Sequence, residues 1–295
     1  MKTGGLFSES ESALHINILE LKAILFSLRA LCEKFSFRHI RVMSDNTTAV
    51  CGINKRGSCK DNLHKVIKEI WFWAMERNIW LSVVHIPGRE NIDADFESRN
   101  FSSSSEWCLD KNVFSAIMKK LGLCQVDLFA SRLNHRLPKY VSMLPDPNAC
   151  AVDAFYYDWS NEKLYMFPPF RFLGKVMKKM LREKVEAVLI LPLFMAQRLS
   201  SLLTLLLVRN PICIPHQALF LHQEMGKPHP MGSSLRLLAC AVSSNLGKNE
   251  AFLSQLEESS IRVGNPVLGH STGLTLGSGR FSVKLEKLIL GMLLL

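Results

Sequence analysis

Short apolar runs alternate with helical patterns between residues 17 and 99, and this alternation limits the possible folds more than any other feature of the chain. Apolar residues recur every three or four positions in the helical patterns, whereas the short runs have the character of strands. The expected elements, in chain order, are a helix over 17–35, a strand over 39–44, helices over 47–55 and 62–77, and a strand over 81–86. This order predicts an α/β fold.

The stretch from Val84 to Arg99 joins the end of the second strand to a turn and a further helix. Pro87 and Gly88 mark the turn, and Asn91 is expected to cap a helix that has carboxylates in its first turn. In this arrangement His85 and Asp95 face one another across the turn.

A run of serines at 102–105 divides the chain, and a second α/β pattern begins after it. The expected elements there are a helix over 106–121, strands over 125–129 and 163–167, a basic helix over 171–184 and a strand over 185–191. Residues 235–242 have a weaker pattern that we interpret as helical. We therefore predict a first domain over 1–105, a second, smaller α/β domain over 106–230, and an irregular tail over 231–295 to which we assign no fold.

The chain is basic, with a net charge of +10, and residues 106–230 contribute most of the excess through 16 basic and 10 acidic side chains. Such a balance favours polyanionic partners, because basic side chains neutralise phosphates and release counterions. It does not by itself distinguish a nucleic-acid-binding protein from other basic proteins.

The eight cysteines include no C-x-x-C pair, and no signal peptide is evident. We therefore expect reduced thiols in an intracellular compartment, the cytoplasm or the nucleus, and no secretion. The apolar run 188–208 is interrupted by Pro192, Gln197 and Arg198, so we expect no membrane-spanning segment.

Three carboxylates are expected to converge if the two strands of the first domain pair. Asp45 follows the first strand, Asp95 opens the helix after the second, and Glu20 lies near the start of the first helix. Magnesium prefers oxygen ligands, and a pair of such ions can activate water and stabilise a leaving 3′-oxygen. His85 has the side chain suited to proton transfer near neutral pH. This set points to phosphodiester hydrolysis.

Each of these residues also has a purely structural explanation. Glu20 follows Asn17 by three positions, as in a capping box, and Asp45 is placed to cap the next helix. Asp93 and Asp95 would be stabilised at a helix N-terminus without taking part in chemistry, and His85 could be an ordinary strand-end histidine. Each explanation is common for a single residue. The occurrence of all these residues together, in this pattern, favours a metal site.

Three segments, 15–23, 42–46 and 85–95, resemble the ribonuclease H domain that follows reverse transcriptase in DIRS-like, tyrosine-recombinase-type retroelements. The resemblance implies metal-dependent hydrolysis of the RNA strand of RNA–DNA hybrids, with Mg²⁺ or alternatively Mn²⁺ as the cofactor. It implies Glu20, Asp45 and Asp95 as metal ligands and His85 as a catalytic residue. Asp95 rather than Asp93 occupies the aspartate position of the Asn-x-x-Ala-Asp motif. The implied partners are the hybrid itself and the reverse transcriptase portion of the same polyprotein.

The chain departs from that family at its start. The family begins with a three-stranded meander whose first strand carries another metal-binding aspartate, whereas residues 1–13 contain no aspartate and lead directly into the first helix. We therefore expect a truncated ribonuclease H-like fold without the first three strands, from a longer polyprotein or a decayed genomic copy. Loss of one carboxylate is expected to weaken metal binding, which puts the activity of this chain in doubt. The alternative is a non-catalytic remnant that binds nucleic acid.

The segment 125–195 resembles the Dam-like adenine methyltransferase segment of the same retroelements. In amino-methyltransferases the corresponding turn is Asp/Asn-Pro-Pro-aromatic, and its first residue hydrogen-bonds the amine of the target base. Here the turn is Phe167-Pro168-Pro169-Phe170, and Phe167 has no acceptor for that bond. DNA adenine methylation is therefore the less favoured third function. The basic residues of helix 171–184 form either a phosphate-binding side or a solvated surface.

Overall fold

The computed structural model describes residues 2–99, 107–214, 219–221, 227–228, 231 and 234–261. The chain has a mixed α/β fold and divides into two compact units. The first unit comprises Met1–Ser104 and Ser142–Val152, and the second comprises Ser105–Val141 and Asp153–Leu295.

The first unit follows the order of helices and strands expected for residues 17–99. Its elements are α1 (Glu9–Ser12), α2 (Ile16–Cys32), β1 (His39–Ser44), α3 (Thr47–Asn54), α4 (Asp61–Glu76), β2 (Trp80–His85), a 3₁₀ turn (Gly88–Glu90) and α5 (Ile92–Arg99). The strands β1 and β2 pair in parallel. A parallel pair needs a crossover connection, which α3 and α4 provide here.

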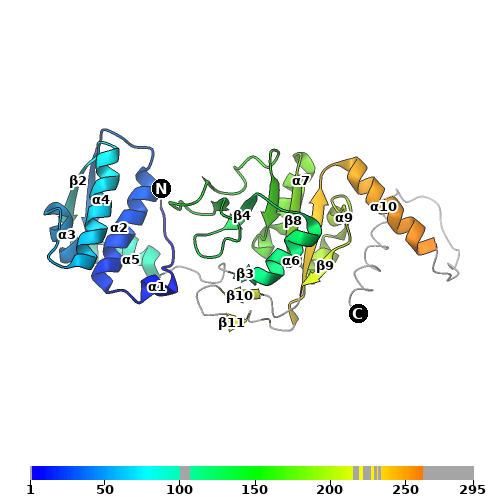
Figure 1. Ribbon diagram of the computed structural model, residues 1–295, viewed down its shortest axis with the longest axis horizontal. Coiled ribbons are helices and arrows are strands. Elements are labelled where there is room, and N and C mark those ends of the chain that lie inside the picture. Colours follow the sequence, from blue (N-terminus) through cyan, green and yellow to red (C-terminus); the bar gives the residue numbers. More distant parts are fainter. Residues whose placement is uncertain are drawn as a thin grey trace. The chain divides into compact units, whose positions relative to one another are not determined.

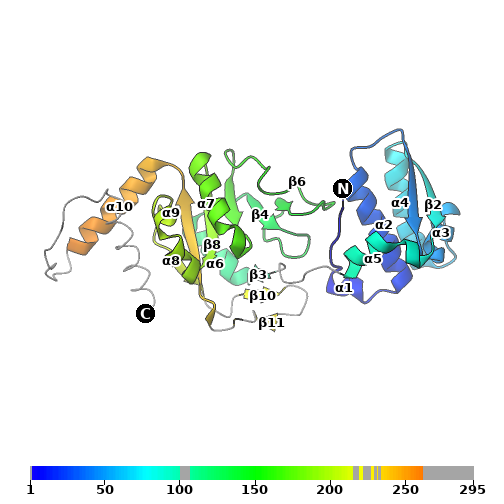
Figure 2. The ribbon, with the colours of Figure 1, turned by 180° about the vertical axis from the view of Figure 1, so that it is seen from behind.

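Helices α2 and α4 cover one face of the two strands (Figure 1). The apolar side chains of Leu81 and Val83 are buried against these helices, and those of Ile40 and Val42 pack there half-buried. Because side chains alternate along a strand, the residues between them point to the other face. Figure 2 shows the two strands from that other side.

The free edge of β2 is closed by a side chain. The Asn54 amide at the end of α3 accepts from the Val83 N–H at 3.0 Å and donates to the Val83 carbonyl at 2.7 Å. Within the residues that the structure describes, no strand pairs with the other edge of β1. One edge of this sheet is therefore blocked, and the other has no paired strand among the described residues.

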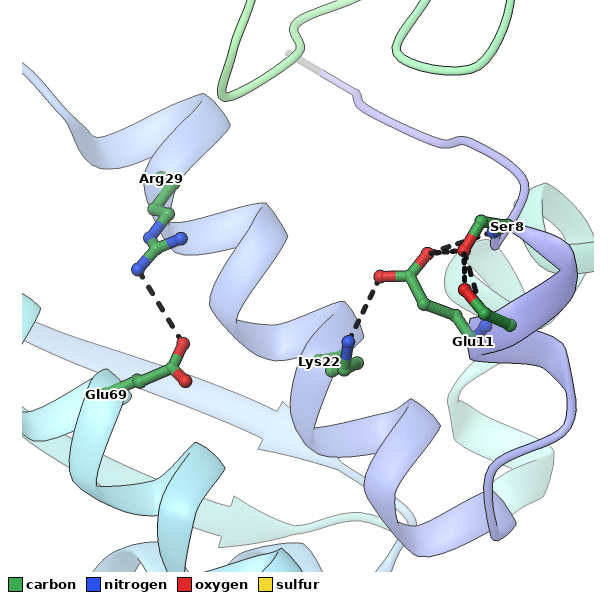
Figure 3. A network of polar contacts seen from close by, with 6 residues as sticks. Ser8, Glu11, Lys22, Arg29 and Glu69 are labelled. Atoms are coloured by element: carbon green, nitrogen blue, oxygen red, sulfur yellow. Dashed lines mark hydrogen bonds and ion pairs between the residues drawn. The ribbon is translucent and has the colours of Figure 1, made fainter.

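Polar contacts tie the first helices together (Figure 3). The side chain of Ser8 and that of Glu11 form a capping box on α1, a helix that the sequence did not lead us to expect. Glu11 also binds Lys22 of α2 at 3.1 Å, and Arg29 of α2 lies 3.9 Å from Glu69 of α4.

The second unit is built on a larger sheet. The elements that follow α5 are β3 (Trp107–Leu109), α6 (Lys111–Leu121), β4 (Val126–Ala130), β5 (Tyr140–Ser142), β6 (Ala151–Val152), β7 (Lys163–Met166), a 3₁₀ turn (Phe170–Phe172), α7 (Leu173–Arg182), β8 (Glu186–Pro192), α8 (Leu193–Arg198), α9 (Ser200–Thr204), β9 (Ile212–Ile214), β10 (Leu219–Leu221), β11 (Lys227–Pro228), β12 (Leu237–Ser243) and α10 (Leu246–Ile261). All of them belong to the second unit except β6 and the last residue of β5, which lie in the Ser142–Val152 segment of the first. Seven strands form one sheet in the order β6-β5-β4-β7-β8-β12-β9, and β11-β10-β3 form another.

Strands β4, β7 and β8 are parallel, and β12 runs antiparallel to both of its neighbours, β8 and β9. The helix expected over residues 235–242 is wrong, because β12 occupies most of this segment and all seven of its residues are buried. The expected helix over 106–121 is also wrong at its start, where β3 precedes α6.

Helix α6 lies on one face of the large sheet, and α7 lies on the opposite face (Figures 1 and 2). The apolar side of α6 packs with Tyr165, Val188 and Ala239 in one core cluster. Within the described part of the chain, every helix is too short or too polar to cross a lipid bilayer.

Candidate functional site

The carboxyl ends of β1 and β2 lie side by side at one edge of the small sheet. Ser44 is opposite His85, and the N–H of Ile86 donates to the Ser44 carbonyl at 3.0 Å. Parallel strands end at the same edge, so the residues that follow them are neighbours. The structure therefore brings Asp45 and the end of β2 to one place.

Asn46 connects this edge to helix α2. Its side-chain oxygen caps α3 by accepting from the Ala49 N–H at 3.0 Å, and its amide nitrogen donates to the Asn17 side chain at 3.0 Å. Asn17 lies in the first turn of α2, one turn before Glu20. This bond holds the start of α2 next to the end of β1.

Glu20 and Asp45 are close enough to affect one another electrostatically. Glu20 is half-buried, and burial raises its pKa above the ordinary value, with the nearby charge of Asp45 as the second cause. Two carboxylates that repel in this way favour a cation or a proton between them. The pair is therefore a candidate for holding a divalent cation.

The turn after β2 folds against Asp45. The Asn91 amide donates to Asp45 Oδ1 at 3.3 Å, and Asp45 Oδ2 lies 3.4 Å from the position that a Cβ on Gly88 would occupy. Asp45 itself is exposed. The hydrogen bond from Asn91 positions an otherwise solvent-facing carboxylate, and a side chain at position 88 would lie directly beside it.

His85 and Asp95 are both exposed. Asp95 lies in the first turn of α5, and its N–H donates to the Asn91 carbonyl at 3.0 Å. Asp93, in the same turn, lies 3.8 Å from Lys2. Asn91 thus bonds both to Asp45 through its side chain and to Asp95 through its backbone.

The described residues contain no group of three or more His, Cys, Asp or Glu side chains arranged to hold a metal ion. The structure therefore brings Glu20 and Asp45 together, but it does not bring Asp95 or His85 into a common ligand set with them.

Two of the structural explanations for these residues are wrong. The capping residue of α2 is His15, whose Nδ1 accepts from the Asn17 N–H at 3.2 Å, so Glu20 lies in the second turn and forms no capping box with Asn17. The capping residue of α3 is Asn46 rather than Asp45. Neither Glu20 nor Asp45 is needed for these helix ends.

Sequence reasoning gave no positioning role to Asn17, Asn46 or Asn54, and it expected Asn91 only as a helix cap and not as a partner of Asp45. The position of Asn46 directly after a strand and before a helical pattern was a usable sign of its capping role. The bond between Asn17 and Asn46 joins residues 29 positions apart, and nothing local indicates it.

A second candidate site lies in the other unit, where the order of the large sheet reverses. The chain passes from β4 to β5 and β6 on one side and then to β7 and β8 on the other. Ligands of open α/β sheets bind beyond the carboxyl ends of the strands at such a point. The turn Phe167–Phe170 follows β7 there.

Aromatic side chains of the chain itself pack around this point. The Phe155 ring lies 5.7 Å from that of Phe129, at the end of β4, and 5.8 Å from that of Phe172. The Phe167 ring contacts Phe170, which in turn contacts Phe194 after β8, each at 6.4 Å. The surroundings of the turn are thus aromatic.

Two lysines of the basic helix are engaged with the protein. Lys175 Nζ lies 3.8 Å from the centre of the Phe155 ring, and Lys179 lies 4.8 Å from that of Trp159 and pairs with Glu183. Lys178 and Arg182 are exposed. The basic helix is therefore only partly available to an external phosphate.

Comparison of the chain with protein-family models and with curated proteins found no match to either.

Proposed function

We propose that the first unit is a retroelement-derived ribonuclease H-like domain whose family activity is the Mg²⁺-dependent hydrolysis of RNA in RNA–DNA hybrids. The observation that carries the proposal is the position of Asp45 at the carboxyl end of a parallel strand pair, beside the start of the Glu20-bearing helix α2, which the Asn17–Asn46 bond holds there. Burial and, secondly, the charge of Asp45 raise the pKa of Glu20. Neither residue serves a helix cap.

The residues present fit a single hard cation. Magnesium is commonly held by one or two carboxylates and keeps several waters, so Glu20 and Asp45 would hold it. Such an ion would supply charge stabilisation for the phosphodiester and a more acidic water. Asn91 would orient Asp45, and exposed His85 would move a proton at the end of β2. The resemblance to the family would make Asp95 of α5 a third ligand, which in this structure lies outside the ligand set of Glu20 and Asp45.

The test is cleavage of a labelled RNA–DNA hybrid by the full chain in Mg²⁺ or Mn²⁺. We expect Asp45→Asn and Asp95→Asn to lose cleavage. Asp93→Asn is the matched control, because Asp93 lies in the same helical turn as Asp95 but close to Lys2. Equal cleavage by wild type and Asp45→Asn would contradict the assignment.

The second candidate is a non-catalytic remnant that binds nucleic acid. The net charge of +10 favours this alternative, because basic side chains neutralise phosphates. Hybrid binding with a steep salt dependence but without metal-dependent cleavage would select it.

Methyl transfer by residues 106–230 is the less favoured alternative. The Phe167 side chain offers no acceptor for an amine, and aromatic rings pack around the end of β4 and the turn after β7. Calorimetric titration with S-adenosylmethionine tests it, and we expect no saturable binding. Saturable binding that is lost on mutation of the Pro168-Pro169 turn would restore this alternative.

A further inference from the structure

The two strands of the first unit have one face that the helices do not cover. Ile40, Val42, Leu81 and Val83 face α2 and α4. By strand alternation the opposite face, here called the open sheet face, consists of His39, Arg41 and Met43 from β1 and Trp80, Ser82 and Val84 from β2.

The open sheet face exposes large side chains. Trp80 is 57% exposed, Met43 63% and Val84 43%. A tryptophan is usually largely buried in a folded protein, so an indole with more than half its surface in solvent is informative. Figure 2 shows the strands from this side.

The open sheet face is also basic. His39 and Arg41 are exposed, none of its six residues is acidic, and no described residue forms an ion pair with Arg41. His39 Nε2 lies 2.8 Å from the Ser82 hydroxyl on the neighbouring strand. Cationic and aromatic side chains therefore share one surface.

Arg56 adds a fixed charge beside Trp80. Its guanidinium lies 4.9 Å from the centre of the Trp71 ring and 5.0 Å from that of Trp80, and the two indoles meet edge to face at 6.0 Å. Trp71 is anchored by its Nε1 bond to the Ile53 carbonyl at 2.9 Å. Trp80 is thus supported from one side while most of it stays in solvent.

We propose that the open sheet face binds single-stranded nucleic acid, with a base stacked on Trp80 and phosphates neutralised by Arg41 and Arg56. Proteins that bind single strands without sequence preference combine aromatic stacking surfaces with basic grooves, and base stacking on a sheet face is a recurrent mode of RNA recognition. The proposal needs no metal and no cleavage, so it goes beyond the nuclease function proposed above.

A second copy of the chain is a poorer occupant for this face. Pairing two open sheet faces would bring the Arg41 guanidinium groups of the two copies onto one interface. Like charges placed opposite one another disfavour such a contact. A polyanion would instead neutralise the positive charge of Arg41.

The test is fluorescence anisotropy of a short labelled oligothymidylate titrated with the full chain in EDTA. We expect Trp80→Leu to weaken binding by roughly 5- to 150-fold, the range expected for loss of one stacked base. Phe72→Leu is the matched control, because Phe72 is 52% exposed and lies 5.3 Å from Lys68 Nζ, but on the solvent side of α4. We expect that variant to bind as wild type does.

A charge variant keeps the proposal testable if Trp80→Leu does not fold. Arg41→Gln should reduce the slope of log affinity against log salt by about 0.7, the value for one phosphate contact to a single strand. Lys65→Gln removes an exposed charge from α4 and should leave the slope unchanged.

Three results would overturn the proposal: no binding of the oligothymidylate, equal losses in the Trp80 and Phe72 variants, or a dimer in sedimentation that Trp80→Leu abolishes. Asp45→Asn should bind the oligothymidylate normally. Failure of hybrid cleavage and failure of single-strand binding are thus separate outcomes.

Discussion

Asp127 is a buried carboxyl group whose ionisation should control the stability of the second unit. It is 3% exposed in β4 and is paired in register with Tyr165 of β7. Burial raises the pKa of Asp127 to about 7, against the opposing effects of the Arg136 N–H, which donates to it at 2.9 Å, and of the Arg136 charge. The Tyr165 hydroxyl beside it is buried without a hydrogen-bond partner among the described residues.

The sign of the effect follows from where the proton is held. In the folded chain Asp127 keeps its proton up to about pH 7, because its pKa there is about 7. In the unfolded chain it loses the proton near pH 3.8, the ordinary pKa of the group. Between these values the folded state binds more protons, so stability falls by ~1.4 kcal/mol for each pH unit. From pH 5 to pH 7 the second unit should lose roughly 2–3 kcal/mol, with little further loss above that range.

Asp127→Asn should remove this loss, because the amide does not titrate and its oxygen can still accept from Arg136. Hydrogen exchange of the β4 and β8 amides, read by mass spectrometry at pH 5 and pH 7, reports on the second unit alone. Asp158→Asn is the control: hydrogen bonds from Ser160 lower the pKa of this exposed carboxyl, so its contribution is lost only at lower pH. A wild-type loss of stability that persists in Asp127→Asn would refute the reasoning.

Three further perturbations test the first unit. Asn54→Leu removes both bonds to the Val83 backbone and should cost about 1–3 kcal/mol, with increased aggregation from the exposed strand edge, measured by urea unfolding and light scattering. Asn46→Ala removes the α3 cap and the link to Asn17 and should cost about 1–2 kcal/mol in the same unfolding assay, whereas exposed Asn62→Ala should change it little. Asp45→Asn should lower the pKa of Glu20 by removing a neighbouring charge; an unchanged carboxyl titration of Glu20 by NMR would show that the two groups do not interact.

The elements of the first unit between residues 17 and 99 were predictable because their limits are set locally, whereas α1 (Glu9–Ser12) was not expected. The strand expected over 39–44 is confirmed, and the helix after it begins at Thr47 because Asn46 caps it. The end of β2 and the start of α5 likewise follow from the turn residues near Pro87 and Gly88.

The second unit was harder to predict because its strands depend on distant partners. The segment Leu237–Ser243 is continuously apolar, and periodicity does not distinguish a buried strand from a buried helix in so short a run. It becomes a strand because it pairs with β8 on one side and β9 on the other. The strand β3 likewise pairs with β10, more than a hundred residues away.

The residues of the candidate site were nameable from the sequence, but their geometry was not. The approach of Glu20 to Asp45 depends on the packing of α2 beside the end of β1, which the Asn17–Asn46 bond supports. The turn at Gly88 and Asn91 was expected only to deliver Asp95. In the structure it also positions Asp45, whose two oxygens face Asn91 and Gly88.

The two proposed functions use opposite ends of the same strands. Trp80 begins β2 and His85 ends it, and five residues of extended strand span ~16 Å. At that separation, with no shared contacts, mutational effects normally add to within about 0.5 kcal/mol. A double variant of Trp80 and Asp45 should therefore show the sum of the single effects on hybrid binding. A larger coupling would mean that one bound strand contacts both the carboxylate edge and the open sheet face, in which case the face would belong to the substrate site of the first unit.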